Sequence, residues 1–361
     1  MDVESAVVWS HRASRRSTWT MVEVVADGIR GVGELSDGAP VDALVAAARS
    51  VGFLITGLPV EKARVAMQDE LVRRRLAGDG FLWSTVLGGY EAAFADLVAR
   101  IEGRALSESL GLGAPRPVRL YANLNRRFGA DGPAAIVAEA LCAIGNGFTA
   151  VKVAPFLDAH AAGLSGTRLI AFALDLVARV RSAIPAGVQL MVDCHHRVPA
   201  DHLAVVTREL AGLALYWVED LVADRSGLES AAEGGLALAA GEHVWDPVVA
   251  AAACAGGALR YWLVDPKHAG GPDGVARIAE AVGETRLTFH NPSGPVGTAH
   301  AAHLAALGGD GTWLEYAWGE ADRLTLIEPA ETVLDGTLRP IGPGIGIGTA
   351  MTRPTTTKEA L

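Results

Sequence analysis

The segment Met191-Val192-Asp193-Cys194-His195-His196-Arg197 joins an apolar run to a cluster of polar side chains. The run Val188–Val192 leads into it and is nearly continuous in apolar residues, which is typical of a parallel strand buried on both faces. It ends in an acid, two histidines and an arginine. Charged groups at the carboxyl end of such a strand lie where α/β proteins build their sites. The segment therefore predicts a site at this strand end, with partners for Asp193 and His195 supplied by other strands.

Short apolar runs of this kind alternate with Ala- and Leu-rich helical stretches from Val118 onward. The eight runs are Val118–Asn123, Ala150–Ala154, Val188–Val192, Leu213–Val218, Leu236–Ala240, Trp262–Val264, Arg286–Phe289 and Thr312–Leu314. Eight βα repeats of roughly 25 residues each predict a (β/α)8 barrel. A doubly wound open sheet is the alternative, but no Gly-rich dinucleotide turn follows the first strand.

The part before Pro115-Arg116-Pro117 has a different pattern. Residues 5–36 alternate like strands, with a hairpin turn at Asp27-Gly28. Three later stretches carry apolar positions at helical spacing, which are 41–50, 60–79 and 89–101. We therefore expect an α+β capping domain over residues 1–115 and a barrel over 116–324. The Gly/Pro-rich tail is expected to fold back and to complete the cap with residues 325–361.

The composition of the chain limits the classes of function that it can have. The chain has 361 residues, half of them hydrophobic and a fifth charged, which is a globular composition. A net charge of −10 argues against a nucleic-acid partner. The three cysteines show no metal-binding spacing, so a reducing, cytoplasmic compartment is the default. We expect no signal peptide and no membrane partner, because the start is not basic and apolar and no run reaches about 18 apolar residues.

One conspicuous polar residue closes each of the six later strands. These residues are Asp193, Glu219, Glu242, Asp265, His290 and Glu315. They follow one another at the period of the βα repeat, so a barrel places all six side chains around one mouth. The second strand adds Lys152 to this set.

Three acids on adjacent strands, Asp193, Glu219 and Glu242, predict a hard-oxygen metal site that favours Mg²⁺ over zinc or copper. The alternative for each acid is a helix N-cap or a surface ion pair.

Asp265 and His290 are expected on neighbouring strands, where the acid orients the imidazole and makes it a better general base. A structural histidine bonded to a loop carboxylate is the alternative. Glu315, if protonated, could donate a hydrogen bond to a developing oxyanion. Its alternative is a salt bridge across the barrel mouth.

These residues and their flanking motifs resemble the enolase superfamily, in its mandelate racemase subgroup. The motifs that carry the resemblance are Val32-Gly33-Glu34, Leu120–Asn123, Ala150-Val151-Lys152, Asp265–Gly271, His290–Pro295 and Leu314-Glu315-Tyr316. The resemblance implies an α/β fold, a modified TIM barrel (β/α)7β with an N-terminal α+β capping domain, and a Mg²⁺ site. It also implies a homo-oligomer and a first step that removes the proton α to a carboxylate, giving a metal-stabilised enediolate.

The second strand reads Lys152-Val153-Ala154 and so lacks the second lysine of the Lys-x-Lys pair in mandelate racemase. A racemase needs a proton donor and an acceptor on opposite faces, so a two-base racemase is disfavoured. Lys152 is then expected to hold the substrate carboxylate or a neighbouring acid. Pairing with a metal-ligand acid is its alternative.

The third strand distinguishes the possible reactions. Along an extended segment Asp193 and His195 point to the same side. Asp193-Cys194-His195 resembles the Asp-x-His of acid-sugar dehydratases such as galactonate dehydratase. The resemblance implies that His290 takes the C2 proton of an aldonate or aldarate and that His195 protonates the leaving β-hydroxyl, which yields a 2-keto-3-deoxy acid. An epimerase, racemase or cycloisomerase acting through the same enediolate is the alternative, and a silent sugar-acid-binding barrel is disfavoured by the intact polar set.

Four further residues are weaker candidates for substrate contacts. His196 should point away from His195, and Arg197 could bind a distal hydroxyl or carboxylate or only brace its loop. Arg16 belongs to the basic loop His11–Arg16, which slightly favours an anionic distal end, although a solvated loop is equally compatible with it. Trp318 could wall the pocket or pack in the core.

Overall fold

The structure is a computed structural model that describes residues 1–14, 17–78, 80–125, 132–339 and 344–352. Its strands are β1 (Val3–Arg12), β2 (Thr18–Ala26), β3 (Ile29–Glu34), β4 (Val118–Asn123), β5 (Ala150–Val153), β6 (Gln189–Asp193), β7 (Trp217–Glu219), β8 (Leu238–Ala240), β9 (Leu259–Val264), β10 (Arg286–Phe289), β11 (Trp313–Ala317), β12 (Ile327–Glu328), β13 (Thr332–Leu334), β14 (Thr337–Arg339) and β15 (Ala350–Met351). Its α-helices are α1 (Val41–Ile55), α2 (Val60–Ala77), α3 (Gly80–Glu102), α4 (Leu106–Ser109), α5 (Gly132–Gly145), α6 (Pro155–Ala161), α7 (Gly166–Ala183), α8 (Leu203–Ala211), α9 (Arg225–Glu233), α10 (Pro247–Cys254), α11 (Gly271–Ala281) and α12 (Pro295–Leu304). Short 3₁₀ helices are η2 (Ala200–His202), η3 (Ala305–Gly308) and η4 (Ala321–Leu324).

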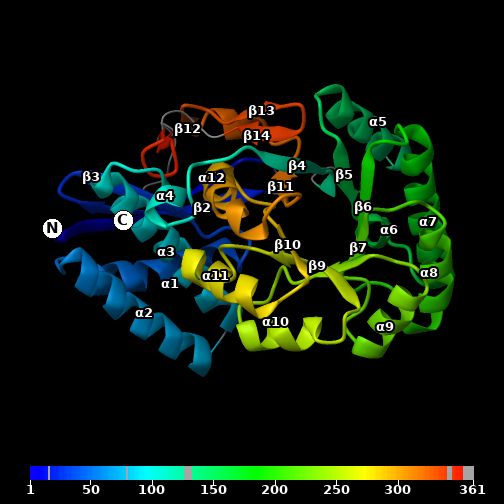
Figure 1. Cartoon of the computed structure of the whole chain (residues 1–361), viewed down its shortest axis with the longest axis horizontal. Helices are drawn as coiled ribbons and strands as arrows, with labels where there is room; N and C mark the ends of the chain where they lie inside the picture. The colour runs from blue at the N-terminus through cyan, green and yellow to red at the C-terminus, as the bar shows by residue number, and fades with distance from the viewer. Residues whose placement is uncertain (15–16, 79, 126–131, 340–343, 353–361) are drawn as a thin grey trace.

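The N-terminal unit is a three-stranded antiparallel sheet, β1-β2-β3, with helices α1 to α3 packed beside it (Figure 1). Asp27 and Gly28 both have positive φ, at 50° and 70°, which matches the right-handed twist of a two-residue hairpin. The predicted turn is therefore confirmed. Gly33 is required where α3 crosses β3, because a Cβ there would lie 1.9 Å from the carbonyl oxygen of Gly89.

The barrel consists of eight parallel strands in the order β4 to β11, and β11 pairs with β4 to close it. An α-helix follows each of the first seven strands, whereas only η4 follows β11 before β12 begins. The predicted (β/α)7β barrel with an N-terminal α+β cap is confirmed. Figure 1 shows the cap helices on one side of the barrel and α5 to α9 on the other.

Two predicted strands differ from the observed ones in a way that affects the site. Strand β7 begins only at Trp217, because the backbone of Ala214 has a positive φ of 49°, which is incompatible with an extended strand. Strand β11 continues to Ala317, so Glu315 lies in mid-strand and the expectation that it ends the strand is wrong. Its side chain still faces inward, because side chains alternate along a strand and Trp313 of the same strand lies in the inner core.

The interior of the barrel is filled with aromatic side chains. The ring centroids of Tyr121 and Trp217 lie 5.4 Å apart, and those of Trp217 and Tyr261 lie 5.1 Å apart. All three side chains belong to one buried inner cluster with Met191 and Leu263. This layer forms a rigid floor beneath the carboxyl ends of the strands.

The C-terminal segment returns to the cap. Gly346 bridges to Ala105, and the Ile347 N–H donates to Asp96 at 2.8 Å. The hairpin β13-β14 of the same segment pairs with barrel strand β4. We propose residue 115 as the boundary between cap and barrel, with the segment from 325 completing the cap and contacting the barrel through this hairpin. Within the described residues no helix is both long and apolar enough to span a membrane.

A buried histidine between cap and barrel predicts acid sensitivity. His300 of α12 lies with Nε2 2.7 Å from the Val32 carbonyl oxygen, and burial lowers its pKa to about 4. The unfolded chain therefore binds a proton between about pH 6.5 and 4 that the folded chain refuses, so stability falls as pH decreases through this window, by up to about 3 kcal/mol. Urea unfolding at about pH 7 and pH 4.5 should show a smaller loss for His300→Gln than for the wild type. An equal loss in both proteins would contradict this assignment.

Candidate functional site

The structure brings together the three predicted metal ligands. Asp193 and Glu219 are the last residues of β6 and β7 and lie side by side in the sheet register. Glu242 follows β8 after Gly241. All three side chains are buried, and one carboxylate oxygen of each lies within 4.8 Å of the others.

Negative charge is in excess in this cluster of buried carboxylates. Burial raises the pKa of Asp193 to about 8 and raises that of Glu219 well above its usual range, although Lys152 acts in the opposite direction. Lys152 is itself buried, with Nζ 2.9 Å from Glu219 Oε2 and 3.4 Å from Glu315 Oε2. The lysine thus pairs with a ligand acid, which was the alternative reading of this residue. Lys152 Nζ also lies 3.6 Å from Asp193 Oδ2, whereas Glu242 pairs with His290 and not with the lysine. The three buried carboxylates form a donor set that suits a hard divalent cation.

The predicted dyad is also assembled. His290 Nδ1 lies 2.9 Å from Asp265 Oδ2, with hydrogen-bond geometry. On the other side of the ring, Nε2 lies 2.9 Å from Glu242 Oε2, within ion-pair distance but without the alignment of a hydrogen bond. Burial acts to lower the pKa of His290, but the charges of Glu242 and Glu315 and the bond to Asp265 together raise it well above its usual value.

Two residues for which the sequence predicted no role contact Asp265, the acid of this dyad. Lys267 Nζ lies 2.9 and 2.7 Å from the two oxygens of Asp265, and His268 Nε2 lies 3.6 Å from Oδ2. Burial acts to raise the pKa of Asp265, but His268, Lys267 and His290 lower it far below its usual value. Lys267 lies in the turn that follows β9, where its own N–H also donates to Asp265 Oδ1 at 2.8 Å.

Glu315 accepts hydrogen bonds in this structure. Tyr121 Oη donates to it at 3.1 Å, the Asn123 side-chain amide donates to it, and the Asn291 N–H lies 3.3 Å away. Burial acts to raise the pKa of Glu315, but Lys152 and His290 lower it overall. The carboxylate form is therefore favoured here, whereas oxyanion donation requires the protonated form.

His195 lies beside the carboxylates, but for a different reason from the one expected. The strand ends at Asp193, and His195 and His196 form a turn with φ at 46° and 52°, so the argument from strand alternation is wrong. The His195 N–H donates to Asp193 Oδ1 at 3.0 Å, and the ring Nδ1 lies 3.1 Å from the same oxygen without hydrogen-bond alignment. Burial lowers the pKa of His195. His196 Nε2 instead lies 3.3 Å from Asp220 Oδ2.

The weaker candidates are not gathered at this cluster. Arg197 is exposed after the turn. Trp318 donates through Nε1 to Glu139 of α5 at 3.1 Å and stacks edge-on against Phe148, so its observed contacts are those of packing between barrel and helices. Arg16 lies outside the described residues.

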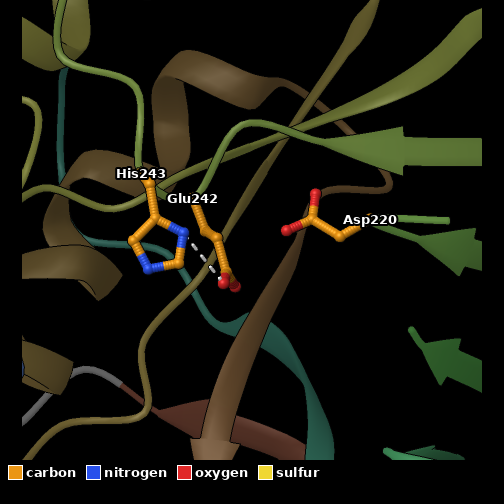
Figure 2. A group of neighbouring side chains, drawn as sticks. All are labelled: Asp220, Glu242 and His243. Atoms are coloured by element: carbon orange, nitrogen blue, oxygen red, sulfur yellow. Dashed lines mark ion pairs between the residues drawn. The ribbon is translucent and has the colours of Figure 1, made fainter. Parts of the chain in front are cut away.

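Two residues at the rim form a second group with Glu242. Figure 2 shows Asp220 and His243 on either side of the Glu242 carboxylate, with the His243 Nδ1 atom 3.2 Å from Glu242 Oε1. Suitable ligand atoms of the three residues lie within 4.8 Å of one another. Each residue directly follows a predicted metal ligand in the sequence, which was the available signal for it. The group places additional charge at the edge of the site.

Comparison with known proteins gives one family match and named relatives. The profile of the enolase C-terminal domain-like family matches residues 135–352. A D-galactonate dehydratase of Verminephrobacter eiseniae is 26% identical over 282 residues, which cover 74% of this chain and 72% of that protein.

Solved structures show the same fold. The 3,6-anhydro-D-galactonate cycloisomerase of Zobellia galactanivorans matches with a TM-score of 0.81 at 20% identity, over 97% of each chain. An enolase from the alpha proteobacterium bal199 with bound Mg matches with a TM-score of 0.80 at 20% identity, also over 97% of each chain.

Proposed function

Because the chain belongs to the enolase C-terminal domain-like family, we propose that it is a Mg²⁺-dependent lyase that dehydrates a sugar acid to a 2-keto-3-deoxy acid. The name of the D-galactonate dehydratase relative favours an aldonate as the substrate class. The observation that carries the proposal is a pair of histidines that flank one acidic cluster, His290 in its dyad with Asp265 and His195 beside Asp193. One histidine supplies a base and the other an acid.

Asp193, Glu219 and Glu242 would hold the Mg²⁺ ion. Their all-oxygen donor set and the raised pKa values of Asp193 and Glu219 fit a site built for a cation. When bound, the ion supplies Lewis-acid polarisation of the substrate carboxylate.

Metal binding gives a direct prediction. Mg²⁺ at 100 times its Kd should raise the free energy of unfolding by about 2.7 kcal/mol, because the ion binds only the folded chain. Glu219→Gln should lose this increment, and its metal-free form should be less stable than the wild type because the buried Lys152 ammonium loses its ion pair with Glu219. Urea unfolding with and without Mg²⁺ measures both values. An equal Mg²⁺ increment in both proteins would remove Glu219 from the ligand set.

Proton abstraction falls to His290. Its Nδ1–H is directed to Asp265, so the C2 proton of the sugar acid is taken at Nε2, which lies 2.9 Å from Glu242 Oε2 in this structure. The raised pKa of His290 favours its protonated form, whereas the base step requires the neutral form. Lys152 offsets the negative charge of the ligands and of the substrate carboxylate. An anionic substrate beside Glu315 disfavours its charged form and so raises its pKa, which allows Glu315 to donate a hydrogen bond to the developing oxyanion.

Elimination falls to His195. Hydroxide is a poor leaving group, so the β-hydroxyl at C3 must be protonated as the C–O bond breaks. His195 Nδ1 lies 3.1 Å from Asp193 Oδ1, so the ring is placed at the acidic cluster to deliver this proton. Burial lowers the pKa of His195, whereas this step requires its protonated form. The resulting enol then tautomerises to the 2-keto-3-deoxy acid.

A screen tests the proposal. A library of aldonates and aldarates is incubated with the protein and Mg²⁺, and keto-acid formation is measured. We expect keto acid from at least one member. Epimers or lactone isomers without keto acid would favour an epimerase or a cycloisomerase, an activity that the Zobellia galactanivorans structure shows to be compatible with this fold.

A further inference from the structure

The segment that carries the proposed general base is held from outside the barrel. It runs from His290 through Asn291 to Gly294 and then enters α12. The Asn291 N–H donates toward Glu315, so a shift of this segment moves contacts to two site residues at once. The residue that holds its far end is Glu34, the last residue of β3 in the cap.

Glu34 caps α12 from another part of the chain. The Gly294 N–H donates to Oε1 and the Gly297 N–H donates to Oε2, both at 2.7 Å. The Ser36 hydroxyl adds a third donor at 2.6 Å. A carboxylate at a helix N-terminus satisfies the N–H groups that lack an intrahelical partner and interacts favourably with the helix dipole. Glu34 is 1% exposed, so water cannot replace these contacts.

The two glycines leave room for this carboxylate. A Cβ on Gly294 would lie 2.8 Å from the Trp19 ring and 3.1 Å from Glu34 Oε1, and a Cβ on Gly297 would lie 3.1 Å from Ser293 Cβ and 3.2 Å from Glu34 Oε2. These distances are shorter than ordinary van der Waals contact, so any larger residue would push against the carboxylate. The close approach of cap and segment therefore depends on residues at both ends of the contact.

The opposite side of the segment is held by a buried guanidinium. Arg323 Nη1 donates to the Ser293 carbonyl at 2.6 Å, and Nη2 donates to Thr298 Oγ1 at 2.6 Å. Glu331 neutralises this arginine, with Nε to Oε1 at 2.7 Å. The segment is thus fixed by an anion at its N–H groups and by a cation at its carbonyl side.

We propose that Glu34 is a positioning residue for His290, through which the cap sets the geometry of the catalytic dyad. The inference rests on the proposed function, because it assigns Glu34 a part in proton abstraction without contact to the substrate. A misplacement of a reacting group by about 1 Å can lower the rate on the order of 10²-fold. Loss of the cap contact should therefore reduce turnover more than substrate binding.

The variant Glu34→Gln tests this. Its amide keeps the shape of the side chain but presents an N–H₂ group to one of the two backbone donors. We expect kcat for C2 deuterium exchange and for dehydration to fall by about 10²-fold, with KM nearly unchanged. We also expect faster amide exchange at Gly294 and Gly297, measured by mass spectrometry.

Asp96→Asn is the matched control. Asp96 is an equally buried cap carboxylate that accepts the N–H groups of Val32 and Ile347, at 3.0 and 2.8 Å. Its loss should lower stability and leave kcat and the amide exchange of residues 290–297 unchanged. If both variants lower kcat alike, Glu34 is merely structural and the proposal is overturned. Wild-type kcat in Glu34→Gln overturns it as well.

If Glu34→Gln does not fold, a second variant tests the same proposal. Gly297→Ala would place a Cβ 3.2 Å from Glu34 Oε2 and 3.1 Å from Ser293 Cβ, so it crowds the contact between Glu34 and the segment. We expect lower kcat, and unchanged kcat would overturn the proposal. A wild-type protein that turns over no sugar acid refutes the proposed function. In that case, amide exchange still tests whether Glu34 holds the segment in place. Exchange at Gly294 and Gly297 that is slow in the wild type and faster in Glu34→Gln supports this role. Exchange that Glu34→Gln leaves unaltered refutes it.

Discussion

His290→Asn is expected to lose C2 deuterium exchange and keto-acid formation together, each by about 10²- to 10⁴-fold. The imidazole is the group whose Nε2 lies free of the dyad bond to Asp265, and asparagine cannot accept a proton there. Proton NMR of the C2 signal in D₂O measures exchange, and a keto-acid assay measures dehydration. Because abstraction precedes elimination, the two rates should fall by the same factor.

The controls for this variant are measurements of its fold and of its Mg²⁺ binding. Circular dichroism should match that of the wild type, and Mg²⁺ should still increase stability, since His290 is not one of the three proposed ligands. Exchange at the wild-type rate would exclude His290 as the base. It would shift that role to another basic side chain at this mouth, such as the buried Lys152.

His195→Asn is expected to separate the two steps. Exchange at C2 should continue because His290 is intact, while keto-acid formation should fall by about 10²-fold or more because the β-hydroxyl leaves without an acid. A substrate analogue with fluoride in place of the C3 hydroxyl should restore elimination, since fluoride needs less assistance from a proton donor.

His196→Asn is the matched control for that variant. His196 is the neighbouring histidine of the same turn, but its ring contacts Asp220, away from Asp193. It should retain both exchange and dehydration. Dehydration that survives in His195→Asn, or that is lost in His196→Asn, would contradict the assignment of His195.

The barrel and the polar residues at its strand ends could be predicted because both are local properties of the sequence. An apolar run followed by Asp193 or Glu219 is a strand with an acid at its end, and the repeat length then places these ends around one mouth. The fold and its closure follow from the same period. What could not be predicted depends on backbone geometry or on distant contacts.

Three examples show the difference. The left-handed turn at His195 and His196 is unusual for non-glycine residues, so a pattern of alternation could not anticipate it. Lys267 was visible as part of a motif, but only the folded chain shows that its ammonium binds both oxygens of Asp265. The contact of Glu34 with Gly294 joins residues 260 positions apart, and nothing in either local pattern pairs them.

Deuterium incorporation into the product tests the central claim most directly. The wild-type protein is incubated in D₂O with Mg²⁺ and a sugar acid identified by the screen, and the product is analysed by NMR and mass spectrometry. Removal of the C2 proton, loss of the C3 hydroxyl and tautomerisation of the enol predict a 2-keto-3-deoxy acid that carries solvent deuterium at C3. Exchange at C2 without any keto acid would contradict dehydration, and unchanged substrate across the whole library would contradict catalysis at this site.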